Sequence, residues 1–449
     1  MEVSERVSHI KVADTVVPCG RVSALRGQIL VASGVRMAVG ESGYVRLSPQ
    51  RTVDVECVGF LEGQGVLLTP YHDITGIKPG LPVVANRRPL GIVTGFGVLG
   101  RLLDGIGRPL DNGPVVTGPK RFFDLTPVPP LSRKKVQDIL WTGVKVIDAF
   151  LTLGQGQRVG IFAGAGFGKT TLLEDIIQGA EADIVVVGLI GERGREVAEF
   201  YRRLDPATKK RTVIFAATSD MPAIMRLKAA WSATIMAETF RDQGKHVLMV
   251  MDSLSRVALA QREIGMETGE LPSARGYTPS VLHLLPRLLE RAGAQENGSV
   301  TGIYTVLVEG DDAYDDPLAD VVRGLLDGHI ILSRQLAQQG HFPAVDVVSS
   351  LSRLMPDLVL EDQWVMARTL GGMVERVARA RDLLEIGAYT VGRDRDLDRA
   401  LATYPAIQAF CDQKRGTTAD PEDTWRELAL LFAEVERWDR AQEEVRGER

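Results

Sequence analysis

The hydrophobic positions of the chain change their spacing twice, which predicts three successive architectures. Up to about residue 85, short segments rich in Val and Leu are broken by turn residues about every ten positions, as in a small β-barrel or sandwich. In the middle of the chain, near-continuous apolar runs alternate with stretches of helical spacing, which indicates a parallel α/β sheet. From about Pro356 onward, apolar residues recur at helical spacing.

The strands of the parallel sheet are expected at five apolar runs. The first run passes directly into a glycine-rich loop, and residues 170–178 after the loop have helical spacing. Residues 86–148 are rich in Gly and Pro, which predicts a segment that wraps onto the sheet. Asp420 and Pro421 fit the N-cap and first residue of a last helix. The predicted strands are residues 158–163, 183–191, 211–218, 246–252 and 301–310.

Composition narrows the class of protein. At 449 residues the chain is long enough for two or three domains, and 45% hydrophobic with 25% charged residues is typical of a soluble globular protein. A net charge of −5 provides no overall positive field, so no nucleic-acid partner is expected. The three cysteines are far apart, and the sequence shows neither a cleavable signal nor an apolar run long enough to span a membrane. We therefore expect a cytoplasmic protein without disulfides or structural zinc.

The glycine-rich loop reads AGAGFGKT and fits a Walker A phosphate-binding loop, with Ala163 where the strict pattern has Gly. Its glycines let consecutive backbone N–H groups turn toward a phosphate, and the next helix presents its positive end. Lys169 is expected to reach the β- and γ-phosphates, and Thr170 to offer its hydroxyl to Mg²⁺. A glycine-rich turn without a ligand is the alternative, which the flanking strand and helix disfavour. The predicted nucleotide-binding residues here are Ala163, Gly164, Ala165, Gly166, Phe167, Gly168, Lys169, Thr170 and Thr171.

Acidic residues follow two other predicted strands. Asp252 ends the apolar run VLMVMD, which suits a carboxylate that contacts Mg²⁺ through water; the alternative is an Asp that caps a turn. Glu192 and Arg193 follow the run DIVVVGLIG, where Glu192 can orient and deprotonate the attacking water and Arg193 can hold phosphate. The stretch GERGRE could also be a solvated charged turn. Its place at the carboxyl edge of the sheet favours a function.

Taken in order, these motifs resemble the catalytic family of rotary ATPases. The motifs are AGAGFGKT, GERGRE, VLMVMDSLSR, GELPSARGYTPSV and PAVDVVSSLSR. Within that family, the stretches AETFRDQGK, LPRLLERAG and LDGHIILSR are most similar to the export ATPases of bacterial type III systems, flagellar or injectisome. The resemblance covers nearly the whole chain from about Gly20.

The resemblance implies a fold and further site residues. The fold would be an N-terminal β-barrel (residues 1–85), a RecA-like P-loop core (residues 86–356) and a C-terminal helical domain (residues 357–449). Arg193 and Arg256 would contact phosphate or neighbouring groups. Phe342 stands where the family usually has a Tyr that stacks on adenine. Arg353, which closes SLSR, matches the arginine finger that enters a neighbouring subunit's site.

The resemblance also implies an activity, a cofactor and partners. The chain would hydrolyse ATP with Mg²⁺ and drive protein unfolding and export, as a ring of six identical copies. Expected partners are the stator or regulator, the central stalk, and the export substrates with their chaperones. The location would be the cytoplasmic face of the inner membrane, without a transmembrane segment. Three alternatives stay open: a catalytic subunit of an F- or V-type proton-translocating ATPase, an RNA translocase of related core, and a nucleotide-binding scaffold without hydrolysis.

Overall fold

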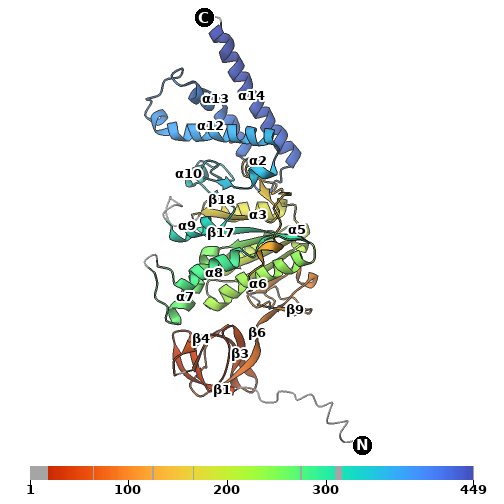
Figure 1. The fold of residues 1–449 in the computed structure, drawn as a ribbon, viewed down its shortest axis with the longest axis vertical. Coiled ribbons are helices and arrows are strands. Elements are labelled where there is room, and N and C mark those ends of the chain that lie inside the picture. The colour runs from red at the N-terminus through yellow and green to blue at the C-terminus, as the bar shows by residue number, and fades with distance from the viewer. Residues whose placement is uncertain are drawn as a thin grey trace, which may run out of the picture.

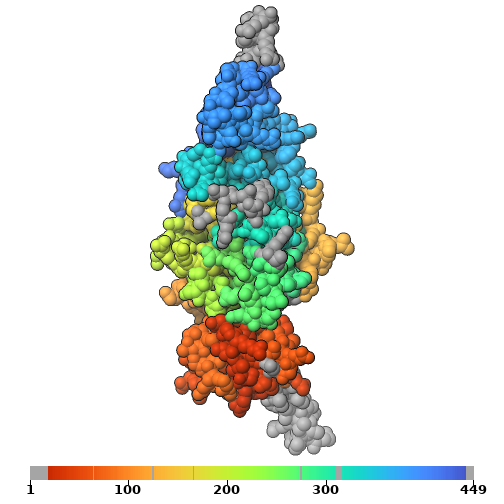
Figure 2. Space-filling model, turned by 90° about the vertical axis from the view of Figure 1, so that its left-hand side faces the viewer, coloured from red at the N-terminus to blue at the C-terminus, as the bar shows by residue number. Residues whose placement is uncertain are grey.

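The structure is a computed structural model that describes residues 19–63, 65–123, 126–164, 166–273, 276–308 and 316–447. Along its long axis, a β-barrel forms one end, an α/β core lies in the middle, and helices form the other end (Figure 1). The space-filling view shows the same three zones stacked in chain order (Figure 2). This is the predicted fold class, although the boundaries between the three parts stay a prediction. The first 18 residues of the predicted barrel domain lie outside the described residues.

The N-terminal part closes into a barrel of antiparallel strands in the order β1-β2-β5-β4-β3-β6. Alternate side chains point inward, so that Leu30, Val45, Val55 and Leu68 share one apolar interior. Closure removes the free edges that an open sheet of this size would expose. The strands are β1 (Cys19–Arg26), β2 (Ile29–Ser33), β3 (Glu41–Ser48), β4 (Arg51–Leu61), β5 (Gly65–Pro70) and β6 (Pro82–Pro89).

The core sheet has the order β19-β18-β12-β17-β15-β13-β14-β8, with β16 paired to β17. The predicted strands of the core are confirmed to within a few residues at each end, and residues 309 and 310 of the last predicted strand lie outside the described residues. The five predicted strands are parallel to one another, as predicted, whereas the short strands β16 and β19, which were not predicted, pair antiparallel. The strands are β8 (Leu102–Asp104), β12 (Arg158–Ala163), β13 (Ile184–Ile190), β14 (Thr212–Ala217), β15 (His246–Asp252), β16 (Gly293–Ala294), β17 (Ser299–Leu307), β18 (Gly328–Ile331) and β19 (Leu351–Ser352).

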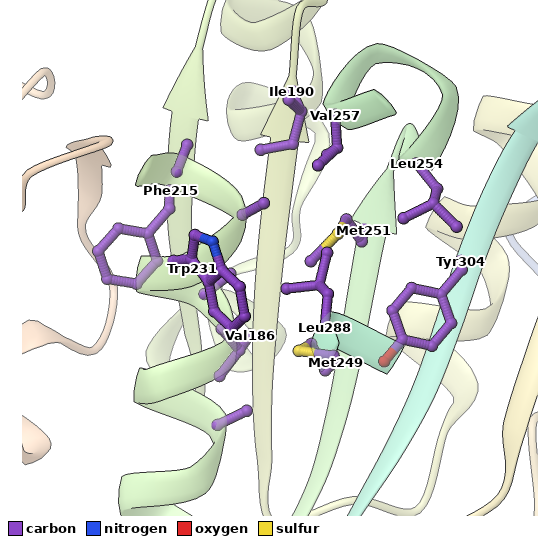
Figure 3. Packing of buried hydrophobic residues seen from close by; sticks show 14 of the residues in the cluster. Val186, Ile190, Phe215, Trp231, Met249, Met251, Leu254, Val257, Leu288 and Tyr304 are labelled. Carbon is purple, nitrogen blue, oxygen red and sulfur yellow. The ribbon is translucent and has the colours of Figure 1, made fainter. Parts of the chain in front are cut away.

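Both faces of the core sheet are buried, which explains why its strands are apolar at every position. One face packs against α6 (Ala223–Asp242), α7 (Leu254–Glu267) and α8 (Pro279–Leu289). There the side chains of Phe215 and Trp231 lie near each other, and Met249 lies near Leu288 (Figure 3). The alternate residues of the same strands face α3, which follows the glycine-rich loop and is called the P-loop helix below, and the C-terminal helices.

The opposite face of the sheet joins the core to the C-terminal helices. One continuous apolar cluster includes Val187 and Val250 from the sheet, Leu173 from the P-loop helix, and Leu370 and Phe410 from the C-terminal part. The helices not yet named are α2 (Lys145–Phe150), α3 (Lys169–Gly179), α4 (Gly194–Arg203), α5 (Pro206–Lys210), α9 (Pro317–Leu325), α10 (Arg334–Gln338), α11 (Met355–Leu358), α12 (Glu361–Glu385), α13 (Arg395–Cys411) and α14 (Pro421–Gly447).

The start of α14 confirms the predicted cap. Oδ1 of Asp420 accepts hydrogen bonds from the N–H groups of Glu422 and Asp423, at 2.9 and 3.1 Å, and Pro421 is the first helical residue. Residues 86–89 complete β6 of the barrel, and the described residues of 90–148 contribute β8 to one edge of the core sheet and otherwise wrap around that sheet. Their other short elements are β7 (Gly91–Val93), η1 (Phe96–Val98), β9 (Lys120–Phe122), η2 (Pro130–Ser132) and β10 (Ile139–Leu140), which pairs with β11 (Leu153–Gly154).

Within the described residues, no helix is both long and apolar enough to span a membrane.

Candidate active site

The glycine-rich loop joins β12 to α3 at the carboxyl edge of the core sheet. Gly166 and Gly168 have φ values of +87° and +85°, which side chains with a Cβ rarely adopt. A Cβ on Gly164 would lie 2.7 Å from the ring of Phe167, so a side chain at this position would have to displace that ring. The loop therefore has the backbone freedom that a phosphate cradle needs, and it ends at the amino terminus of α3. Ala165 lies outside the described residues.

Lys169 and Asp252 meet beside the loop. The ammonium group of Lys169 contacts Oδ1 of Asp252, whose side chain is 5% exposed. The same oxygen accepts a hydrogen bond of 2.6 Å from the hydroxyl of Thr305, which is fully buried on β17. β17 lies between β12 and β15 in the sheet, which places Thr305 between the loop and Asp252. The sequence interpretation missed Thr305; its only signal was a hydroxyl residue within an apolar strand.

Glu192 follows β13 at the same edge of the sheet. Its Oε1 is buried, forms no hydrogen bond with the described residues, and lies 3.9 Å from Nζ of Lys169. Burial, reinforced by the nearby negative charge of Asp252, raises the pKa of the Glu192 carboxyl to about 7. This carboxyl can therefore gain or lose a proton near neutral pH, as a general base must.

A cavity of about 240 Å³ adjoins these carboxylates. Its lining includes Thr170 and Glu174 of α3, Glu192, Asp252 and Arg203 of α4. A water molecule occupies roughly 30 Å³ in the liquid, so the cavity has room for several waters next to Glu192. The site thus combines a phosphate-type loop, an ion pair at its lysine and a buried carboxylate beside water-accessible space.

The two predicted arginines of this region lie differently. Arg256, in the first turn of α7, lays its side chain over Gly191, where a Cβ would come within 3.1 Å of it. Its positive charge acts on Glu192 and lowers the pKa of that carboxyl, against the larger effect of burial. Arg193 begins α4 as its N-cap, and its guanidinium is 77% exposed and lies 3.9 Å from Glu196. The structure therefore does not tie the Arg193 side chain to the loop.

Phe342 and Arg353 lie at opposite edges of the sheet. The Phe342 ring lies against the glycine-rich loop, since a Cβ on Gly168 would be 3.4 Å from two of its carbons. Arg353 follows β19, whose partner β18 begins beside the start of β12. The Arg353 N–H donates to the carbonyl of Asp327 at the amino edge, while its exposed guanidinium makes no hydrogen bond or ion pair with any described residue. The length of β12, roughly 16 Å, separates this residue from the loop of its own chain.

Two family models match the chain. Residues 143–352 match the ATP synthase alpha/beta family, nucleotide-binding domain, and residues 359–429 match the T3SS EscN ATPase C-terminal domain. The chain is 41% identical to the flagellum-specific ATP synthase of Bacillus subtilis, over 97% of this chain and 100% of that protein. This chain belongs to the type III export ATPase family. The predicted resemblance is thus confirmed.

Other relatives of this export ATPase come from both kinds of type III system. The flagellum-specific ATP synthase of Salmonella typhimurium is 43% identical, over 93% of this chain and 94% of that one. The SPI-2 type 3 secretion system ATPase of the same organism is 45% identical, over 84% and 87% of the two chains. The structure of the assembled ATPase EscN from enteropathogenic E. coli superimposes with a TM-score of 0.87 at 40% identity, over 92% of this chain and all of that one.

Proposed function

We propose that the chain hydrolyses ATP bound with Mg²⁺ and uses the energy to unfold and export proteins through a bacterial type III apparatus, flagellar or injectisome. One observation supports the chemical part: Lys169, Asp252 and Glu192 converge at the carboxyl edge of the sheet, beside the glycine-rich loop in which Gly166 and Gly168 have positive φ. Family membership carries the export part, since the relatives are named as flagellum-specific and type 3 secretion ATPases.

The residues present fit Mg²⁺ held together with a nucleotide. Within the described residues no cluster of three or more acidic, His or Cys side chains could hold a metal alone. Mg²⁺ usually keeps several waters and takes few protein ligands beside substrate phosphates, so a sparse donor set is expected. Thr170 would bind the ion through its hydroxyl and Asp252 through water. Bound Mg²⁺ would neutralise charge on the β- and γ-phosphates.

Glu192 would act on the attacking water. Glu192 lines the cavity, and its Oε1 lies 3.9 Å from Nζ of Lys169 without a hydrogen-bond partner among the described residues, so its carboxylate can accept a proton from water. The water oxygen then bonds to the γ-phosphorus, the bond from that phosphorus to the ADP oxygen breaks, and the proton passes to Glu192. Lys169 would stabilise the charge that develops on the phosphate oxygens, and the proposed contacts of Arg193 and Arg256 would add to this. The remaining residues of 163–171 would bind the phosphates, and Phe342 would stack on the base.

Arg353 would complete the site of a neighbouring copy. It lies at the amino edge of the sheet, and its exposed guanidinium has no partner within the described part of its own chain. A chain that holds Glu192 at one edge and a free arginine at the other can form complete sites between identical subunits. We therefore propose a closed ring of six copies.

Partners follow from the relatives. The structure of EscN has been described both as an assembled ATPase and in complex with its central stalk EscO. We propose that this chain likewise binds a central stalk, together with a stator or regulator, export substrates and their chaperones. It would act at the cytoplasmic face of the inner membrane as a peripheral protein. The match of residues 359–429 to a type III C-terminal domain favours this over a catalytic subunit of an F- or V-type ATPase.

Phosphate release by the purified chain tests this proposal. The chain alone should hydrolyse Mg²⁺–ATP, whereas a subunit that needs a non-identical partner should not. Glu192→Gln should bind ATP and lose about 10²- to 10⁴-fold in kcat, because the base is gone while the binding loop is intact. Glu199→Gln, on the same cavity lining, is the matched control and should keep its rate. In cells, Glu192→Gln should block secretion of a flagellar or injectisome substrate. A Glu192→Gln enzyme within twofold of wild type would overturn the assignment.

A further inference from the structure

The segment between α13 and α14, residues 412–420, makes hydrogen bonds with the backbone of Phe342, the residue proposed to stack on the base. We name it the α13–α14 connector. The N–H of Phe342 donates to Oδ1 of Asp412 at 3.1 Å, and the Phe342 carbonyl accepts from the N–H of Gln413 at 2.7 Å. Both backbone groups of Phe342 are therefore fixed by the connector. The ring itself is 40% exposed beside Gly168, so contacts of the side chain alone hold it weakly.

Gln413 also fastens the connector to the core. Its side-chain oxygen accepts from the N–H of Lys145 at 2.8 Å, and its side-chain nitrogen donates to the carbonyls of Gly143 and Thr417 at 2.8 and 2.7 Å. All polar atoms of the amide side chain are thus in use. Residues 143–145 lead into α2, which packs on the core and on α14, so the connector has a firm anchor.

The same connector holds the P-loop helix. Arg415 pairs with Glu174 at 2.6 Å, and the N–H of Gly416 donates to Oδ1 of Asp175 at 3.0 Å. Glu174 is 3% exposed and lies one helical turn after Thr170. The connector therefore spans from the aromatic ring to the helix that begins at the phosphate loop. It thus links Phe342 to α3.

We propose that Asp412 and Gln413 are positioning residues that hold Phe342 where a purine base can stack on it. This inference rests on the proposed function, because it takes the loop to bind a nucleoside triphosphate. Stacking of a base on an aromatic residue changes affinity by about 5- to 150-fold. The full gain in affinity requires a ring that is ordered before the base binds. A mobile ring must be ordered during binding, and this ordering reduces the affinity.

The test compares ATP with inorganic tripolyphosphate, which has the phosphates but no base. Asp412→Ala removes one hydrogen bond that holds Phe342, so the ring must be ordered when the base binds, which predicts about a 2- to 12-fold weaker ATP Kd. Tripolyphosphate affinity and kcat at saturating ATP should stay unchanged. Asp412→Asn keeps a side-chain oxygen and should restore ATP binding. Gln413→Leu should act like Asp412→Ala, because it frees the connector from residues 143–145.

Two further measurements separate positioning from a general loss of structure. Lys414→Ala, which removes an exposed side chain from the same connector, should leave both affinities unchanged. On a Phe342→Ala background, Asp412→Ala should have no further effect, since both act through the ring. Equal weakening of ATP and tripolyphosphate, additive effects with Phe342→Ala, or an unchanged ATP Kd would each overturn the inference. If the wild-type chain bound neither ATP nor tripolyphosphate, that result would refute the proposed nucleotide-binding function and not only the positioning role of Asp412 and Gln413.

Discussion

Lys169 and Asp252, 83 residues apart in sequence, form an ion pair at the carboxyl edge of the core sheet. The lysine is 12% exposed and the aspartate 5%, so each charge depends on the other for compensation. Glu192 lies 3.9 Å from the same ammonium group, and arrival of a nucleotide phosphate would give Lys169 a further anionic partner. In this structure Lys169 therefore already contacts Asp252, the residue proposed to contact Mg²⁺ through water.

Replacement of Lys169 tests the phosphate assignment. Lys169→Ala should weaken ATP binding by about tenfold or more, because a charge-assisted contact with the phosphates is lost. Isothermal titration with Mg²⁺–ATP measures this directly. Lys209→Ala, which removes a lysine that stacks on Tyr201 away from the loop, is the control and should bind ATP normally. Unchanged affinity in Lys169→Ala would refute a phosphate role for this residue.

The raised pKa of Glu192 predicts a pH-dependent rate. The carboxyl must be deprotonated to accept a proton from water, and with a pKa of about 7 it is mostly protonated below that pH. Wild-type kcat/KM should therefore rise with pH through about 7 and level off above it. A pH profile of the free enzyme measures this. The residual activity of Glu192→Gln should lack the rise, and a wild-type profile that is flat through neutral pH would contradict the assignment.

The same pKa predicts an effect on stability. A carboxyl whose folded-state pKa is raised binds its proton more tightly when folded, so its contribution to stability falls as pH rises from about 4.5 to 7. Glu192→Gln carries no charge to bury and should unfold at a higher temperature than wild type at pH 8. Near pH 5, where Glu192 is protonated, the difference should largely vanish. Differential scanning calorimetry at both pH values measures this, and an equal or lower unfolding temperature at pH 8 would count against the burial argument.

A buried ion pair attaches the barrel to the core. Lys228 of α6 lies 2.7 Å from Oε2 of Glu56 on β4, and the hydroxyl of Tyr71 donates to the same oxygen at 2.5 Å. Both charged side chains are 9% exposed. Lys228→Ala leaves a buried carboxylate without its cation and should cost about 3–5 kcal/mol. Urea unfolding that monitors the barrel measures this.

An exposed pair between the same two parts is the matched control for Lys228. Arg108 lies 2.6 Å from Asp54 of β4, but the two side chains are 51% and 39% exposed. Arg108→Ala should therefore cost less than about 1 kcal/mol, because water screens this pair. If both variants lost the same stability, burial would not be the cause of the difference between them.

The sequence predicts most of the core because its signals are local. The strand before the loop, the helix after it and Asp252 at the end of β15 can each be identified from the residues around them. Parallel strands then bring their carboxyl ends together, which groups Lys169, Glu192 and Asp252 without further information.

Other features depend on pairings between distant segments. Strand β8 has three residues within a Gly- and Pro-rich segment, and only its pairing with β14 makes it a strand. The position of Arg353 follows from the pairing of β19 with β18, because two residues carry no periodicity of their own. Likewise, nothing local to Asp412 and Gln413 points to Phe342, which lies 70 residues before Asp412. These relationships arise from tertiary contacts alone.

The position of Arg353 leads to the last prediction, that catalytic sites form between copies. Arg353→Ala should bind ATP but lose about 10³- to 10⁵-fold in turnover, as arginine fingers do in other P-loop enzymes. Arg379→Ala, which removes an exposed arginine of α12 that pairs with Glu375 one turn away on the same helix, should keep its rate. Phosphate release by the two variants measures the difference. A fully active Arg353→Ala enzyme would exclude this arginine from any site.

Mixed rings then distinguish a neighbour's site from the chain's own site. Glu192→Gln and Arg353→Ala are each expected to be nearly inactive alone, but an interface that takes Glu192 from the Arg353→Ala subunit and Arg353 from the Glu192→Gln subunit is intact. Random mixing in a closed ring makes about a quarter of the interfaces intact. Dissociated, mixed and reassembled subunits should therefore regain up to about a quarter of wild-type turnover, and less if the sites must act in sequence. If Arg353 served its own chain, each variant would stay defective in every ring and mixing would restore nothing. Strict coupling between the sites could also leave mixed rings inactive. Titration of wild-type subunits into an inactive ring tests for such coupling, because activity then falls more steeply than the fraction of wild-type subunits.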